Sequence, residues 1–186
     1  MGDLIDRDGF RANVGIVLMH GDGRLFLGRR SGGRGWQFPQ GGMRRGELAE
    51  ESLFRELQEE VGLNATDVRL LGQTRRWLRY RLPQQFVRRE QKPLCIGQKQ
   101  RWFLLQLASD EAAIRFDRTD QPPEFDRWRW VDFWQPIREV IYFKRTVYTR
   151  ALHELGGAVY PGGLPAYPTW WHNTATQNEA AAGTGT

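Results

Sequence analysis

The sequence contains a single cysteine, Cys95, among its 186 residues. One thiol cannot form an intrachain disulfide, and it cannot supply the cysteine cluster of a structural zinc site. No histidine or acidic residue stands next to Cys95, so we expect a buried thiol rather than a nucleophile. A chain without disulfides is typical of the reducing cytoplasm, and we expect a cytoplasmic protein.

The sequence also lacks a long apolar run. Residues 1–8 mix charged and apolar side chains, which is not the pattern of a signal peptide or a membrane anchor, so no membrane partner is expected. A chain of 186 residues has the length of one domain and can bury a substantial core.

Apolar periodicity is missing after Gly156. The segment is rich in Gly, Pro, Ala, Thr and Asn, and its apolar content is too low to offset the entropy of ordering. We therefore predict one domain over residues 1–156 and a disordered tail over residues 157–186. The adjacent Trp170 and Trp171 are the exception. They indicate docking on a partner or on this domain, unless the segment is incidentally sticky.

Charge is not balanced along the chain. Lysine and arginine number 27 against 22 aspartate and glutamate residues, and the net charge of +5 favours a polyanionic partner. Four glutamates are concentrated between residues 51 and 60, so the positive charge must gather elsewhere. A basic surface around an acidic metal site suits a nucleotide or RNA ligand.

The hydrophobic pattern predicts an α+β fold. Residues 14–19 and 25–28 read as an antiparallel pair joined at Asp22-Gly23, a favoured hairpin turn. Further strands are expected at residues 68–71, 75–82, 97–107 and 128–131. Helical spacing covers residues 48–61, which Gly62 ends, and residues 136–155, which Gly156 and Gly157 end. The sum is a set of strands covered by two helices.

Glu56, Glu59 and Glu60 follow the spacing i, i+3 and i+4 in the first predicted helix, and Glu51 lies one turn earlier. Like charges at this spacing are neighbours on one side of a helix and repel one another unless a cation is bound. Mg²⁺ prefers oxygen ligands and is usually held by a few carboxylates together with substrate phosphates. A helix with a merely solvated acidic face is the alternative interpretation.

The spacing of Gly41, Glu47 and residues 55–63 resembles the signature of the Nudix hydrolases at every defining position. The resemblance implies an α+β Nudix fold, with a mixed sheet between helices, and hydrolysis of a phosphoanhydride. It implies two or more Mg²⁺ ions, for which Mn²⁺ or Zn²⁺ can substitute. By the same resemblance the metal ligands are Glu56, Glu59, Glu60 and Gly41, while Gly42, Glu47 and Arg55 support the geometry of loop and helix.

The identity of the general base is left open by the resemblance, because this role moves within the superfamily between the helix and a distant loop. Glu124, stiffened by Pro122 and Pro123, is the loop candidate, with an ordinary exposed glutamate as the alternative. Glu59 is the second candidate for the base, and Glu56 is expected to take part in catalysis through the metal.

Other segments extend the resemblance toward the bacterial RNA pyrophosphohydrolases within this family. They are residues 10–15, 36–42, 77–80, 97–100, 123–126 and 143–145. This branch removes pyrophosphate from the 5′-triphosphate end of RNA, which leaves a monophosphate and promotes mRNA decay. A sister group that hydrolyses dinucleoside polyphosphates shares residues 36–42 and remains the alternative. A non-catalytic Nudix module is a further rival, and the need for a protein activator stays open.

The resemblance also places a set of residues around the substrate channel: Arg11, Arg30, Arg79, Tyr80, Lys99, Phe143 and Lys144. Cationic side chains among them suit phosphates. Phe143 suits stacking on an RNA base, as aromatic side chains do with single strands. Tyr80 has two interpretations, a hydrogen bond to phosphate or a place in the core. The basic run over residues 75–92 either follows the RNA backbone or is a solvated surface.

Overall fold

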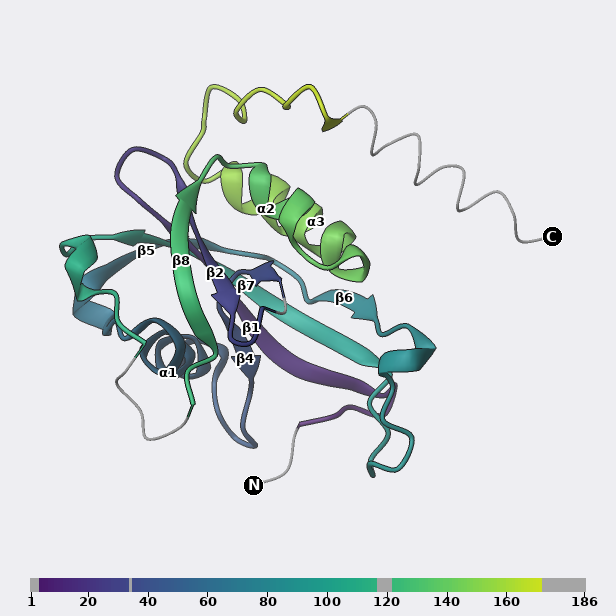
Figure 1. Cartoon of the computed structure of the whole chain (residues 1–186). Coiled ribbons are helices and arrows are strands. Elements are labelled where there is room, and N and C mark those ends of the chain that lie inside the picture. The colour runs from purple at the N-terminus through teal and green to yellow at the C-terminus, as the bar shows by residue number, and fades with distance from the viewer. Residues whose placement is uncertain (1–3, 34, 117–121, 172–186) are drawn as a thin grey trace.

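The computed structural model describes residues 4–33, 35–116 and 122–171, and these form strands and helices in the order shown in Figure 1. The strands are β1 (Phe10–Met19), β2 (Leu25–Arg30), β3 (Trp36–Gln37), β4 (Gln40–Gly42), β5 (Val68–Gln73), β6 (Leu78–Arg81), β7 (Gly97–Leu107) and β8 (Phe125–Val131). The helices are α1 (Ala49–Val61), α2 (Gln135–Glu139) and α3 (Arg145–Gly156). The predicted α+β class is confirmed.

The central strands of the mixed sheet are β1 and β7, which pair in parallel from Phe10↔Gly97 to Met19↔Gln106. Strands β5 and β6 pair antiparallel with β7, and the short β4 pairs antiparallel with β1. The predicted hairpin is confirmed at Met19↔Leu25, beside its turn, after which β2 pairs with β8 and β3. Strand β4 thereby comes to lie against the first half of β1.

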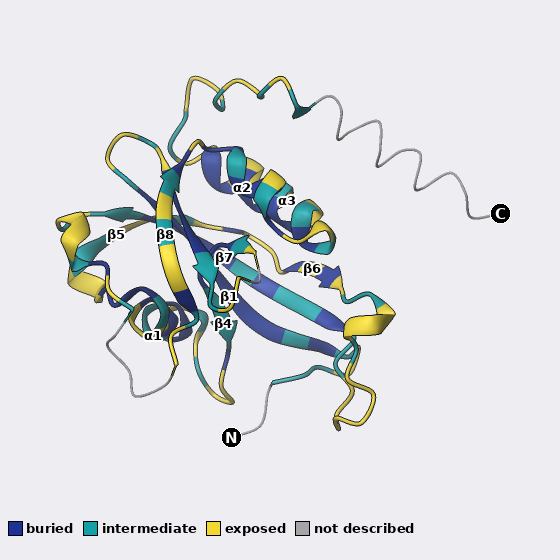
Figure 2. Ribbon diagram, in the orientation of Figure 1, coloured by how far each residue is buried: buried dark blue, intermediate teal, exposed yellow. Residues whose placement is uncertain are grey.

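Alternation along β1 and β7 separates two apolar cores, because successive side chains in a strand point to opposite faces. On one face Val17 and Trp102 pack with α3. On the other face Ile16 and Phe103 pack with α1. Figure 1 shows α1 on one side of the sheet and α2 with α3 on the other, and Figure 2 shows the inner faces buried.

Helix α1 confirms the first predicted helix. Its seam of Leu53, Leu57 and Val61 is fully buried, and it ends at Gly62, whose φ of 77° is a conformation that favours glycine. A carboxylate oxygen of Glu51 accepts a hydrogen bond of 2.9 Å from the backbone N–H of Leu48. Glu51 therefore stabilises the start of the helix, where an acidic side chain is favoured.

The prediction of one helix over residues 136–155 is wrong, because the chain breaks between α2 and α3. Val140 and Ile141 adopt extended backbone angles, with ψ of 153° and 137°, and a 3₁₀ turn over Tyr142–Lys144 follows. β-Branched and aromatic side chains are poor helix formers, which lowers the cost of the break. Val140, at the break, and Lys144, in the turn that follows it, are both buried.

The prediction of disorder from residue 157 onward does not hold for residues 157–171, which pack on the domain. The indole N–H of Trp134 donates a 2.8 Å hydrogen bond to the carbonyl of Pro165, and the Trp171 ring lies 5.1 Å from the Trp134 ring. Aromatic contacts of this kind offset the entropy of ordering. Residues 172–186 lie outside the described residues. No helix in the described ranges has the length and apolarity needed to cross a membrane.

Candidate functional site

A cavity of about 550 Å³ lies on the α3 side of the sheet, at the end where β1 begins. Its walls come from strands β1, β2, β3, β4, β6 and β7, from helix α1, from the loop between β6 and β7, from the loop before β8 and from the turn before α3. The lining residues are Arg11, Asn13, Arg30, Gln37, Gln40, Gly41, Gly42, Glu56, Glu60, Tyr80, Leu82, Phe86, Arg88, Gln91, Cys95, Gln98, Glu124, Phe143 and Lys144.

The strands place polar side chains in this cavity by the same alternation that builds the core. Arg11 and Asn13 belong to the face of β1 that continues as Val17, and Gln98 belongs to the face of β7 that continues as Trp102. The face that is apolar under α3 is therefore polar at this end. Oδ1 of Asn13 is buried with no hydrogen-bond partner among the described residues. A buried polar atom of this kind indicates a place for a ligand.

Gly41 and Gly42 leave room for two charged side chains of the cavity. A Cβ atom on Gly41 would collide with the carboxylate of Glu56, and one on Gly42 would collide with the guanidinium of Arg11. A side chain at either glycine would therefore displace one of these groups. The absence of side chains lets Glu56 and Arg11 approach the backbone of β4.

Arg55 connects α1 to the loop in front of it. Its guanidinium donates two hydrogen bonds to Glu47, of 2.7 and 3.0 Å, and a third of 2.9 Å to the carbonyl of Gly42. These bonds to Arg55 lower the pKa of the Glu47 carboxyl to about 2, and Glu47 in turn raises the pKa of Arg55. Glu47 and Arg55 thus connect α1 to the loop before it, as expected for residues that support the geometry of loop and helix.

Glu56 and Glu60 face the cavity with incomplete compensation for their charge. Burial raises the pKa of Glu56, which the hydrogen bond from Arg55 only partly opposes. Burial raises the pKa of Glu60 well above its ordinary value, and the charges of Glu56 and Glu124 add to the effect. The backbone N–H of Gln40 donates one hydrogen bond of 2.9 Å to Glu60. These carboxylates sit where a bound cation would stabilise them.

Glu59 does not join Glu56 and Glu60 at the cavity. Its carboxylate lies 3.2 Å from Nη1 of Arg55 and 3.3 Å from Nη2 of Arg44, on the exposed side of α1. Within the ranges that the structure describes, no three His, Cys, Asp or Glu side chains are grouped closely enough to hold a metal. The expected cluster is not preassembled: Glu56 and Glu59 both pair with Nη1 of Arg55, and Glu59 lies on the exposed side of α1.

The donor set nevertheless fits a hard divalent cation. Three carboxylates, those of Glu56, Glu60 and Glu124, line one cavity beside the glycine backbone of β4, and Mg²⁺ prefers such oxygen ligands. The close approach of Glu56 to Gly41 puts a carboxylate and a strand backbone side by side. The metal site stays a prediction, with Glu56 and Glu60 supported by their position and Glu59 placed apart.

Glu124 reaches the cavity from the loop before β8. Nε of Arg30 donates a 2.8 Å hydrogen bond to its carboxylate, and the backbone N–H of Ser31 donates one of 2.8 Å to its carbonyl. The loop is thereby attached to the end of β2. Of the two candidates for the general base, Glu124 lines the cavity and Glu59 does not.

Lys144, Tyr80 and Phe143 line the cavity side by side. Burial lowers the pKa of Lys144 to about 8, with the charge of Arg30 adding to the effect, and its ammonium contacts the side-chain oxygens of Gln37 and Gln40 at 3.3 and 3.2 Å. Tyr80 is 7% exposed and packs in the core, and its hydroxyl has no hydrogen-bond partner within the described residues. The core interpretation of Tyr80 is confirmed, and the hydrogen bond to phosphate stays a prediction.

Arg79 and Lys99, for which a substrate role was expected, do not line the cavity. They occupy the opposite face of β6 and β7 from Tyr80 and Gln98. Lys99 lies 2.8 Å from a carboxylate oxygen of Asp6, and Arg79 lies 3.5 Å from one of Asp8. The N-terminal segment thus pairs with both cations.

Several lining residues were not among the expected site residues: Asn13, Gln37, Gln40, Phe86, Gln91 and Gln98. A signal existed for some of them, because Asn13 and Gln98 are polar residues on strand faces that are apolar further along. Arg88 belongs to the basic run for which an RNA contact was one interpretation, whereas Phe86 and Gln91 carried no signal. Cys95 is half-buried and lines the cavity, so the expectation of a buried thiol is wrong.

Comparison with known proteins agrees with this geometry. A family model described as the NUDIX domain matches residues 9–151. The chain is 57% identical over 165 residues to an RNA pyrophosphohydrolase of Alkalilimnicola ehrlichii, which covers 89% of this chain and 91% of that protein. It is 60% identical over 152 residues to an RNA pyrophosphohydrolase of Pseudomonas aeruginosa, covering 82% and 95% of the two chains. The chain belongs to the Nudix hydrolase family.

Solved structures share the fold at low identity. A dihydroneopterin triphosphate pyrophosphohydrolase of E. coli superposes with a TM-score of 0.58 at 20% identity, over 75% of this chain and 92% of that one. An Ap4A hydrolase of C. elegans gives 0.57 at 17% identity, over 82% and 98%. The predicted Nudix fold is confirmed, and the protein is a hydrolase of phosphoanhydride bonds.

Proposed function

We propose that this Nudix hydrolase removes pyrophosphate from the 5′-triphosphate end of RNA in the cytoplasm, leaving a 5′-monophosphate that promotes mRNA decay. The observation that carries the proposal is the cavity, where three carboxylates and several cations face one another across a space of about 550 Å³. The relatives that share more than half of their residues with this chain bear the name RNA pyrophosphohydrolase.

The cations of the cavity suit the triphosphate. Arg11 and Arg30 enter from β1 and β2, and Lys144 enters from the turn before α3. Their charges neutralise phosphate oxygens, and the Tyr80 hydroxyl, which lacks a partner among the described residues, can donate a hydrogen bond to one of them. Phe143 lines the same cavity with Phe86, whose ring lies 5.3 Å away, and the two rings suit a base near the 5′ end.

The carboxylates provide the hydrolytic side of the cavity. Glu56 and Glu60 would hold Mg²⁺, or Mn²⁺ or Zn²⁺ in its place, and Glu59, which shares Nη1 of Arg55 with Glu56, would have to turn toward the cavity to join them. A bound divalent cation supplies charge neutralisation at the phosphoryl oxygens and makes a water more acidic. Glu124 is the residue that we assign as the base that accepts a proton from the attacking water, because its carboxylate faces the cavity beside Arg30.

The test uses a short RNA that carries a label on its terminal phosphate, incubated with the full chain and Mg²⁺. We expect labelled pyrophosphate and a 5′-monophosphate RNA. A matched reaction with diadenosine tetraphosphate tests the alternative substrate, and a large preference for the dinucleotide would overturn the proposal. Binding of the RNA without release of any labelled product would instead support a non-catalytic module.

Two variants make this test specific. Glu60→Gln removes a carboxylate from the cavity while its amide oxygen can still accept the hydrogen bond from Gln40. Glu50→Gln removes the same charge from the exposed side of α1 and serves as the matched control. We expect loss of product with the first variant and full activity with the second.

A further inference from the structure

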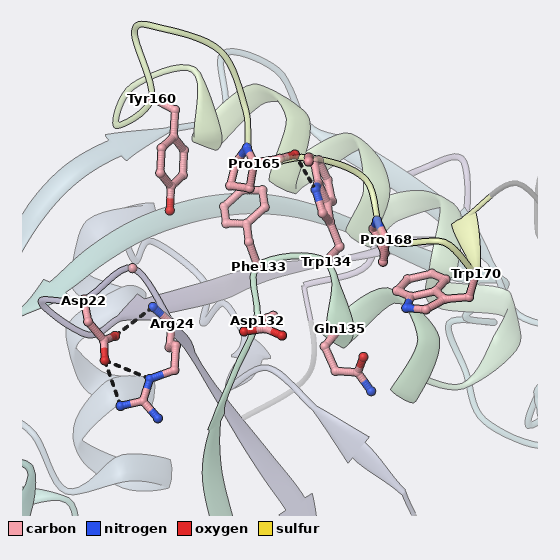
Figure 3. A pocket seen from close by; sticks show the side chains of 12 residues that line it. Asp22, Arg24, Asp132, Phe133, Trp134, Gln135, Tyr160, Pro165, Pro168 and Trp170 are labelled. Carbon is pink, nitrogen blue, oxygen red and sulfur yellow. Dashed lines mark hydrogen bonds and ion pairs between the residues drawn. The ribbon is translucent and has the colours of Figure 1, made fainter.

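A second hollow, of about 390 Å³, lies far from the catalytic cavity. It is enclosed by the β1–β2 turn, the end of β8 and the segment of residues 157–171 (Figure 3). Asn13 lines the catalytic cavity, and the six residues to Met19 at the other end of β1 span about 20 Å at the usual rise of a strand. The hollow therefore belongs to a separate site.

Aromatic side chains form its walls. Figure 3 shows Tyr160 and Trp170 on opposite sides, with Phe133 and Trp134 between them. The Tyr160 ring packs edge-on against Phe133 at 5.4 Å, and the hydrogen bond from Trp134 to Pro165 fixes the segment that carries Tyr160 and Trp170. One wall of the pocket therefore comes wholly from residues 157–171, the segment after α3.

The two carboxylates of the pocket, those of Asp22 and Asp132, differ in the partners that they have. Asp22 is fully engaged by Arg24, because one of its oxygens accepts two bonds of 2.8 Å from the guanidinium and the other accepts one of 3.0 Å from the backbone N–H. Asp132 is exposed at the mouth of the pocket, where its charge acts on Arg24, but its carboxylate makes no hydrogen bond or ion pair within residues 4–33, 35–116 and 122–171. It is a carboxylate available to a cation beside aromatic rings.

The surroundings are acidic although the protein as a whole carries a charge of +5. Arg24 is shared with an adjacent hollow that also contains Asp110, Glu111 and His20. Four carboxylates, those of Asp22, Asp110, Glu111 and Asp132, therefore lie around one arginine and one histidine. Such a surface repels the phosphates of RNA and attracts a basic ligand.

We propose that this pocket binds an arginine side chain presented by a protein partner. A planar guanidinium stacks on aromatic faces and pairs with a carboxylate through two parallel hydrogen bonds, so arginine fits the pocket of Trp170, Tyr160 and Asp132 better than lysine does. The acidic rim continues beyond the pocket to Asp110 and Glu111, which fits basic residues on both sides of that arginine and hence a protein segment. The inference does not depend on the proposed catalytic function.

The first test uses N-acetyl-arginine amide as the probe and N-acetyl-citrulline amide as its uncharged isostere, with nuclear magnetic resonance spectra of the full chain. We expect the arginine probe to shift the indole N–H signals of Trp134 and Trp170 in a saturable manner, and the citrulline probe to bind at least tenfold more weakly. Equal binding of the two probes, or no saturable shift with either, would overturn the proposal.

Variants assign the contact to Asp132. Asp132→Asn is expected to weaken binding of the arginine probe about tenfold, the effect of losing a charge-assisted hydrogen bond. Trp170→Ala is expected to weaken it as well, since the stacking surface is lost. Glu50→Gln, which removes one exposed negative charge on α1, is expected to leave binding unchanged. Unchanged binding in Asp132→Asn would contradict the assignment.

A second test separates a protein segment from other sources of the same chemistry. A peptide with arginine between two lysines is expected to bind severalfold more tightly than one with arginine between two glycines at low salt. Asp110→Asn, whose amide oxygen can still cap the following turn as Asp110 does toward Ala112, should reduce this difference. Equal affinity of the two peptides, or stronger shifts from a single-stranded oligonucleotide, would refute a basic protein partner.

Discussion

Arg55 and Lys144 are both cations that lie near glutamates, but only Arg55 has direct carboxylate partners. Its bonds to Glu47 raise its own pKa and lower that of Glu47. Lys144 contacts two glutamine oxygens and no carboxylate within the described ranges, and burial lowers its pKa to about 8. The Arg55 network is complete and stabilises the fold, whereas the groups facing the cavity lack partners that a phosphate and a cation would supply.

The largest effect is expected at the cavity, where the charged groups lack partners. Glu60→Gln should lower turnover of 5′-triphosphate RNA on the order of a hundredfold or more, because electrostatic groups in the reaction site carry large shares of the rate. The raised pKa of Glu60 shows that its charge is unfavourable in the folded state, so the free energy of unfolding should stay constant or rise. Activity assays and urea unfolding of the same preparation measure both quantities.

A loss of stability in Glu60→Gln in proportion to its loss of activity would contradict this contrast between the cavity and the Arg55 network. Glu50→Gln provides the reference for a charge change on the same helix that does not face the cavity.

The Arg55 network, in which the charges are paired, should respond in the opposite way. Glu47→Gln leaves Arg55 without its main partner in a largely buried place, and we expect the free energy of unfolding to fall by about 3 kcal/mol at pH 7, as when one member of a buried pair is removed. Urea unfolding measures the loss. A change below about 0.5 kcal/mol would place the pair among weak surface contacts instead.

The same pair predicts a pH window. Interaction with Arg55 lowers the folded-state pKa of Glu47 from 4.5 to about 2, so its stabilisation is present above pH 4.5 and is lost as the pH falls toward 2. The difference in unfolding free energy between the wild type and Glu47→Gln should therefore shrink over this interval.

Lys144 gives a smaller, kinetic effect. Because burial lowers its pKa to about 8, the charged form that binds phosphate is lost as the pH rises, and KM should increase about fivefold between pH 8 and pH 9. Lys144→Met should show a higher KM that changes little over this range. Steady-state kinetics on a short 5′-triphosphate RNA distinguish the two profiles, and parallel profiles would assign the titration to another group.

The sequence was sufficient to predict much of the fold and part of the site. Alternation and helical spacing located β7 and α1, and the spacing of the glutamates located Glu56 and Glu60. The break between α2 and α3 was not predicted, because Ile137 through Leu155 contain enough apolar residues for a continuous helical face, and only tertiary contacts of Lys144 and Val140 show the interruption. The packing of Trp171 on Trp134 likewise depends on contacts that spacing cannot show.

Arg79 and Lys99 show how resemblance and pattern can disagree. Alternation along β6 puts Arg79 on the side opposite to Tyr80, yet the resemblance placed both around the substrate channel. The side chains in the structure follow the alternation, and Lys99 and Arg79 form ion pairs with Asp6 and Asp8. A strand pattern is thus the stronger guide to which face a side chain occupies.

The smallest expected effect tests this conclusion. Arg79→Ala and Lys99→Ala should each change KM for a short 5′-triphosphate RNA by no more than roughly twofold, since pairs at the surface contribute little and the two side chains face away from the cavity. Arg11→Ala, which removes a cation from the cavity itself, should raise KM by a much larger factor and serves as the positive comparison. A large effect of Arg79→Ala, with unfolding unchanged, would mean that the RNA contacts both faces of β6.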